Sequence, residues 1–171
     1  IISAGTTNMY NYGVSLATVG PARGHGVQCD AKTLTQLRDC AATYQGGLKV
    51  KLTHQGDAGD IIGALRNLRI EGPKLLGDLH LLKSYERRAY IVELASTIPD
   101  TFGLSVSFSG PEEEVGGLRC ARCTEIYSCD LVAEPAANPS GLFSANVDAR
   151  RESIAMTPEE ILNKAKAEVT A

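Results

Sequence analysis

Serine hydroxyls line one face of a short predicted strand. Residues 103–109 read GLSVSFS, and strict alternation places Ser105, Ser107 and Ser109 on one face and the apolar residues on the other. A serine hydroxyl becomes a nucleophile only when a nearby base removes its proton. Serines also commonly cover the solvent face of a sheet, so this spacing alone favours a structural role for them.

His54 lies at the end of a second predicted strand. Residues 48–53 (LKVKLT) alternate strictly between apolar and polar types, and a polar loop at 55–60 follows them. A histidine with an ordinary pKa of about 6.5 accepts a proton at neutral pH, as a general base must. Alternation, however, places His54 on the apolar face. Either the strand ends or twists before His54, or this residue is an interior structural histidine.

An aspartate stands among apolar residues in the predicted extended segment 124–132 (TEIYSCDLV). Alternation places Tyr127, Cys129 and Leu131 on the face expected to be buried, and Ser128 and Asp130 on the opposite face. A carboxylate in this setting can orient a catalytic histidine. It can equally cap a turn or pair with a cation, and the sequence leaves both roles open.

Two of the five cysteines form the motif Cys120-Ala-Arg-Cys123. Structural zinc normally requires a second such pair, and the remaining cysteines lie at unrelated spacings. A redox-active pair normally lies at a helix N-terminus, whereas this one lies in a predicted extended segment. We therefore expect no metal and no cofactor. An odd cysteine count without a secretory segment favours a reducing compartment.

Composition restricts the classes of protein to which the chain can belong. It has 171 residues, of which 43% are hydrophobic and 22% charged, and its net charge is −3. These values are typical of one compact globular domain and exclude wholesale disorder. The absence of a basic excess argues against nucleic acid as a partner. No apolar run approaches the roughly 20 residues of a membrane span, so no membrane partner is expected.

Periodicity predicts a strand-rich main body, residues 1–143, followed by a tail at 144–171. The tail consists of a polar linker at 144–156 and a short amphipathic helix that begins with the capping box Thr157-Pro-Glu-Glu160. The main body is predicted to hold two helices, at 31–44 after the N-cap Asp30 and at 85–97. The predicted strands lie at 12–19, 48–53, 61–70, 75–82, 103–109 and 118–132, and the acidic run 112–114 is predicted to be a solvated turn.

Three of these elements together form an ordered set of motifs. They are His54-Gln55 followed by Ile62-Gly63, the run 102–108 (FGLSVSF), and the run 130–139 (DLVAEPAANP). In order and spacing they resemble the prohead, or capsid maturation, proteases of tailed bacteriophages, which are related in fold to herpesvirus assemblins. The resemblance extends over residues 13–143.

The resemblance implies a Ser-His-Asp site. Ser105 occupies the position of the family's nucleophile, with Ser107 as the reserve candidate, and His54 occupies the position of the base. The third member varies within the family, and position assigns it to Asp130, with Glu125 as a competitor. No arginine motif matches the one that often contributes to the family's oxyanion site.

His80 and His25 remain as further candidates for the third catalytic group. His25 lies in a glycine-rich loop, and His80 lies on the strand predicted at 75–82. His25 is expected to be exposed, and His80 shares a strand face with Asp78 and Leu82; either could substitute as the third catalytic group, to which position assigns Asp130.

The resemblance also implies a fold, a reaction and partners. The fold would be α+β and mainly β, a small closed or partly closed β-barrel flanked by helices, with a C-terminal helical tail. The protein would be a serine endopeptidase without cofactor that cleaves capsid and scaffolding polypeptides, and its own linker, inside proheads assembling in the host cytoplasm. A homodimer is left open. The alternative is a non-catalytic capsid assembly or scaffolding protein with a protease-like fold.

Overall fold

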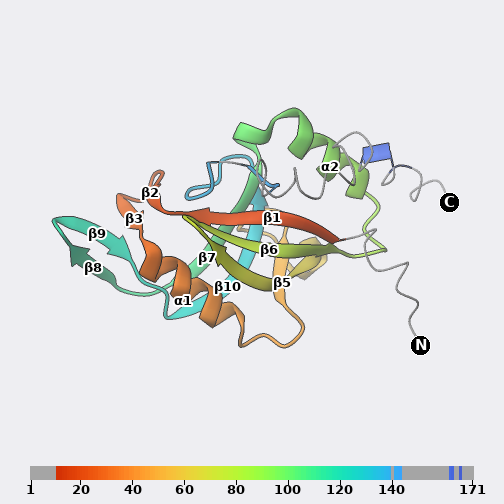
Figure 1. Cartoon of the computed structure of the whole chain (residues 1–171). Coiled ribbons are helices and arrows are strands. Elements are labelled where there is room, and N and C mark those ends of the chain that lie inside the picture. The colour runs from red at the N-terminus through yellow and green to blue at the C-terminus, as the bar shows by residue number, and fades with distance from the viewer. Residues whose placement is uncertain (1–10, 140, 144–161, 164–165, 167–171) are drawn as a thin grey trace.

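The computed structural model describes residues 11–139, 141–143, 162–163 and 166. Its strands and helices confirm the prediction of an α+β, mainly β fold, and Figure 1 shows α2 above strand β1 and α1 below it. In chain order the elements are β1 (Asn11–Thr18), β2 (Gly20–Ala22), β3 (Val27–Cys29), α1 (Ala31–Ala41), β4 (Leu48–Lys51), the 3₁₀ turn η1 (Ala58–Asp60), β5 (Ile61–Glu71), β6 (Lys74–Leu81), α2 (Arg88–Thr97), η2 (Pro99–Thr101), β7 (Gly103–Ser109), β8 (Glu112–Val115), β9 (Leu118–Ala121) and β10 (Glu125–Val132).

The first sheet consists of four antiparallel strands in the order β1-β6-β5-β4. Alternating apolar residues of these strands are buried and form one core together with residues of α1 and α2. Strands β5 and β6 form the predicted hairpin, in which Glu71 pairs with Lys74. Gly72 in its turn has a φ of +57°, a conformation that glycine adopts without strain.

Strands β7 and β10 form a second, two-stranded antiparallel sheet that lies between the edges of the first. A single parallel bridge, Leu52 to Leu131, connects β10 to the end of β4. On the other side, the buried Asn138 Nδ2 donates to the carbonyls of Ser15 on β1 (2.6 Å) and Leu104 on β7 (3.1 Å). The prediction was a closed or partly closed barrel. The described strands form no closed barrel, because these contacts take the place of continuous strand pairing.

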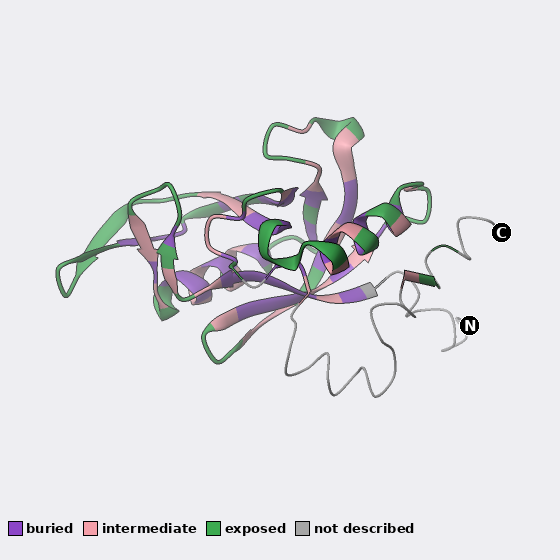
Figure 2. Cartoon of the chain, turned by 90° about the horizontal axis from the view of Figure 1, so that it is seen from above, coloured by how far each residue is buried: buried purple, intermediate pink, exposed green. Residues whose placement is uncertain are grey.

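The third sheet, in the order β2-β3-β9-β8, extends away from the core. Figure 2 shows part of it as a green, exposed hairpin at one end of the molecule, which corresponds to β8 and β9. The acidic run 112–114 is therefore part of a strand, and its prediction as a turn was wrong. Residues 118–132 were predicted as one extended run, and they form two strands separated by residues 122–124.

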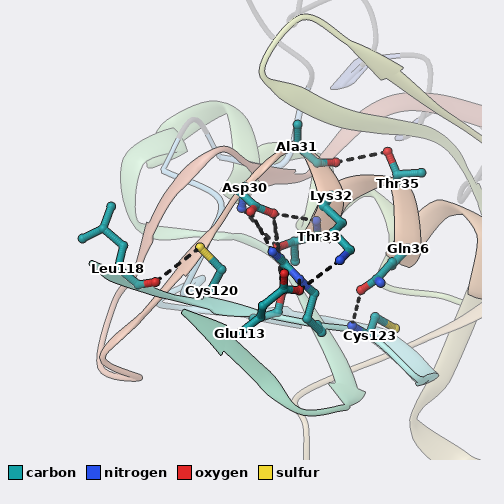
Figure 3. A network of polar contacts seen from close by, with 12 residues as sticks. Asp30, Ala31, Lys32, Thr33, Thr35, Gln36, Glu113, Leu118, Cys120 and Cys123 are labelled. Carbon is teal, nitrogen blue, oxygen red and sulfur yellow. Dashed lines mark hydrogen bonds and ion pairs between the residues drawn. The ribbon is translucent and has the colours of Figure 1, made fainter. Parts of the chain in front are cut away.

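Side chains along one face of α1, and Tyr44 beyond its end, hold the main chain of residues 121–126. These hydrogen bonds run from Thr33 Oγ1 to the Ala121 carbonyl (2.7 Å), from the Cys123 N–H to Gln36 Oε1 (2.9 Å) and from the Tyr44 hydroxyl to the Ile126 carbonyl (2.6 Å). Figure 3 shows the contact of Gln36 with Cys123. The helix therefore fixes the segment that leads into β10.

Asp30 begins α1 as predicted and also binds a buried arginine. One carboxylate oxygen accepts the Thr33 N–H (2.9 Å), which caps the helix. Arg122 donates to both oxygens of Asp30 (2.8 and 2.9 Å) and to Glu113 on β8 (2.7 Å). In Figure 3, Asp30, Thr33 and Glu113 converge at this point. The ion pairs join the exposed hairpin to the helix, and α1 itself ends at Ala41, three residues earlier than predicted.

Most of the predicted tail lies outside the described residues. The linker at 144–156 and most of the helix after Thr157 belong to this part, and of the tail only residues 162, 163 and 166 are described, as helical. Leu162 among them packs against the core. No helix in the described ranges has the length and apolar character needed to cross a membrane.

Candidate active site

Strands β7 and β10 bring two of the predicted site residues together. Asp130 is paired directly with Ser105, and Ser128 with Ser107. Residues paired directly in an antiparallel sheet have Cα atoms about 4.5–5.5 Å apart and side chains on the same face. The four side chains therefore project from one face of this sheet.

The turn after β4 brings His54 to the same place. Strand β4 ends at Lys51, and Thr53 has a left-handed φ of 63°, which interrupts the alternation predicted from the sequence. The Thr53 N–H donates to the Leu131 carbonyl of β10 (3.0 Å) and so fixes the turn to that strand. The His54 side chain is 45% exposed, so it is not the interior histidine that strict alternation would have produced.

His54 and Asp130 form a short hydrogen bond, with 2.7 Å between Nδ1 and Oδ2. The Asp130 side chain is fully buried, and its Oδ2 also accepts the Ser128 hydroxyl at 2.9 Å. An ionised carboxylate accepts hydrogen bonds and cannot donate them, so the ring proton lies on Nδ1. The neutral ring then presents Nε2 as the atom that can accept a proton.

Ser105 and His54 line one cleft of about 370 Å³. Ser105 is 6% exposed, and its hydroxyl makes no hydrogen bond to any residue that the structure describes, His54 included. Bonds between a nucleophile and its base are often long without substrate and shorten in its complex. The other residues lining the cleft are mostly small or apolar: Ala17, Ala22, His25, Val27, Cys29, Leu37, Val106, Ser107, Phe108, Glu112, Ala121, Ala136 and Ala137.

The competing candidates for the third catalytic group do not contact His54. Glu125 is exposed at the far end of β10, about 17 Å from Asp130 along the strand, and accepts the Tyr127 hydroxyl at 3.4 Å. His80 lies on β6, where burial and the nearby cations Arg66 and Lys83 lower its pKa. Ser107, the reserve nucleophile, lines the same cleft as Ser105, as does His25.

A bulge in β10 explains why Tyr127 was predicted on the wrong face, whereas Leu131 is buried as predicted. The pairing with β7 shifts register between Ile126 and Ser128, so Tyr127 is the extra residue. Tyr127 is 42% exposed, although alternation predicted it to be buried. Ser128 is almost fully buried and was not predicted as a site residue. Its position two residues before Asp130, and therefore on the same face of a strand, was the signal that pointed to it.

The cysteines form no metal centre in the described part of the chain. No group of three or more histidine, cysteine or acidic side chains lies close enough there to hold an ion. Burial raises the pKa of the Cys123 thiol to about 12, and it also raises that of Cys120. Both thiols are therefore protonated at neutral pH, unlike the activated thiols of redox motifs.

Comparison with known proteins found no match: no protein-family model and no curated protein matches this sequence. The geometry around His54, Asp130 and Ser105 is thus the basis on which a function is assigned.

Proposed function

We propose that the protein is a serine endopeptidase with Ser105 as nucleophile, His54 as general base and Asp130 as the group that orients the base. The observation that supports this most directly is the 2.7 Å bond between His54 and the buried Asp130, next to the serine paired with Asp130 across the sheet. Acyl transfer uses an arrangement of this kind, with a buried carboxylate that orients an imidazole and a serine that lines the same cleft as the imidazole.

In the proposed reaction His54 Nε2 removes the proton of Ser105 as its Oγ attacks a peptide carbonyl. The imidazolium then gives this proton to the leaving amine, and the acyl group stays on Ser105. Water, deprotonated by the same nitrogen, releases the acyl group and regenerates the serine. Asp130 remains ionised throughout and stabilises the imidazolium.

The edge of β7 opposite β10 has no paired strand among the described residues, and the part of it beyond the Asn138 contact supports an extended polypeptide as substrate. Asn138 binds the Leu104 carbonyl, so this carbonyl points away from β10. Backbone groups alternate in direction along a strand, so Val106 also presents its N–H and C=O away from β10, towards the cleft that it lines. A peptide added to this edge would pass Ser105 with its backbone hydrogen-bonded.

The site and the connections between sheets are consistent with a prohead maturation protease of the assemblin-like kind. The Leu52–Leu131 bridge and the Asn138 contacts connect β4 to β10 and β7 to β1, which supports the proposal of a partly closed barrel. Capsid and scaffolding polypeptides, and the chain's own segment 144–156, are the substrates we propose. The reaction would take place inside assembling proheads in the host cytoplasm.

Labelling with a fluorophosphonate, followed by mass mapping of the modified peptide, tests the nucleophile. We expect label on Ser105 in the wild-type protein and none at that position in Ser105→Ala, with unchanged circular dichroism. Ser109→Ala, which removes an exposed hydroxyl from the same strand, should label normally. Label on Ser107 instead of Ser105 would contradict the assignment of the nucleophile.

A non-catalytic assembly protein with this fold is the second candidate. The observation in its favour is that Ser105 makes no hydrogen bond to His54. Co-expression with a candidate capsid protein separates the two functions. An endopeptidase releases shortened capsid chains that Ser105→Ala does not release, whereas an assembly protein supports particle formation equally well with either form.

A further inference from the structure

Asp130 receives its hydrogen bonds in an asymmetric way. Oδ2 accepts both His54 Nδ1 and the Ser128 hydroxyl, whereas Oδ1 is buried and has no partner among the described residues. Ser128 is 1% exposed, and its hydroxyl makes this one side-chain hydrogen bond. The Asp130 carboxylate already contacts the candidate base, so the second, buried donor needs a physical explanation.

We propose that Ser128 is a positioning residue of the active site, which fixes the plane of the Asp130 carboxylate for His54. The inference rests on the proposed function. The last torsion of an aspartate has a broad distribution, so its hydrogen bonds decide how the carboxylate is turned. His54 sits on a turn and is half exposed, so it cannot define this plane firmly. Ser128 lies on the same strand and face as Asp130 and can.

Ser128 also sets how strongly Asp130 acts on His54. A hydroxyl that donates to Oδ2 stabilises part of the carboxylate charge, so less of it is available to His54. Without this donor the full carboxylate charge acts on His54 Nδ1 and favours the imidazolium form. The base would then be protonated, and inactive, over a wider range of pH.

The variant Ser128→Ala tests both effects. We expect the rate of fluorophosphonate labelling of Ser105 at neutral pH to fall about tenfold, because one hydrogen bond to a charged group is lost. We also expect the acid limb of the rate-against-pH profile to move to higher pH, since His54 must lose its proton before it can act. Ser128→Thr keeps the hydroxyl and should restore the wild-type profile.

Ser15→Ala is the matched control. Ser15 is also fully buried on a strand, but its hydroxyl donates to the neutral amide of Asn138 (2.8 Å). Losing that bond should lower the melting temperature without moving the acid limb. If Ser15→Ala moves the limb as far as Ser128→Ala, the shift reflects general loosening of the fold, and the positioning role is refuted.

Titration of His54 by NMR tests the proposal without any substrate. In the wild-type protein the Nδ1 proton should appear far downfield, and in Ser128→Ala the His54 titration should move to higher pH. An unchanged titration in a folded Ser128→Ala protein overturns the inference. Absence of Ser105 labelling in the wild-type protein would instead refute the proposed function, while this measurement would still decide whether Ser128 acts on His54.

Discussion

At the scale of single residues, the hydrogen bonds of Asp130 are unevenly distributed. Asp130 is a fully buried acid with two donors on one oxygen and none on the other. Burying a charge is costly unless it is hydrogen-bonded, so this incomplete arrangement reduces stability. Such a cost is typical of residues retained for function. Asp130 therefore invites a substitution that keeps its shape and removes its charge.

Asp130→Asn should cut labelling of Ser105 by about 10⁴ at neutral pH. The amide can donate to His54 Nδ1, which would place the ring proton on Nε2, the atom that must accept the serine proton. Stopped-flow or gel-based labelling measures the rate, and the thermal midpoint should fall little or rise, because a buried charge is removed. Turnover as fast as the wild type would move the orienting role to another group.

At the scale of elements, α1 and the hairpin β8–β9 are joined through Asp30 and Arg122. Hydrogen bonds from Arg122 hold the pKa of Asp30 well below its ordinary value. An acid whose pKa is lower in the folded state stabilises that state at pH above its unfolded pKa, about 3.9. This stabilisation disappears as pH falls through the lower, folded pKa.

Asp30→Asn should reduce the free energy of unfolding by about 3 kcal/mol at neutral pH, since it leaves the buried Arg122 without its bidentate partner. Asparagine is as good an N-cap as aspartate, so the loss reports the ion pair and not the cap. Urea unfolding should show this difference narrowing below pH 4. Asp39→Asn, which removes an exposed pair with Arg38, should change stability by less than about 1 kcal/mol.

Local patterns predicted the elements that alternate or cap in the ordinary way. Strand β7 was predicted with its observed bounds, the β5–β6 hairpin within a residue or two, and Asp30 as the N-cap of α1. Alternation failed where the backbone departs from a regular strand, at the left-handed Thr53 and the bulged Tyr127. Both departures depend on contacts with distant strands, so no short window of sequence contains them.

In the candidate site, too, some features could be predicted from local sequence and others depend on contacts with distant residues. Ser105, His54 and Asp130 were selected by residue type and by resemblance, and the structure places His54 against Asp130 and Asp130 opposite Ser105. Ser128 was overlooked because its position on the same face as Asp130 gains meaning only once Asp130 is known to contact His54. Strand β8 was overlooked because three consecutive glutamates satisfy no apolar period. It pairs with β9, and Arg122 and Lys32 contact it through Glu113.

At the scale of the whole molecule, four of the five cysteines are buried and the fifth, Cys40, is partly buried. Cys29 on β3 and Cys123 before β10 are buried, and burial raises their thiol pKa values to about 11 and about 12. Iodoacetamide at pH 8 should therefore modify them only as fast as the molecule unfolds, whereas in urea all the cysteines should react at once. Mass spectrometry of digested samples measures each site. Rapid alkylation of Cys123 in the native protein would contradict this packing.

Asn138 has a consequence for the order in which the molecule is made. Its amide connects β1 to β7, yet it follows both of them in the chain, by 123 residues from Ser15 and 34 from Leu104. A chain emerging from the ribosome therefore contains the serine-bearing strand well before the residue that seals it against β1. Synthesis must therefore pass position 138 before Asn138 can connect the two strands.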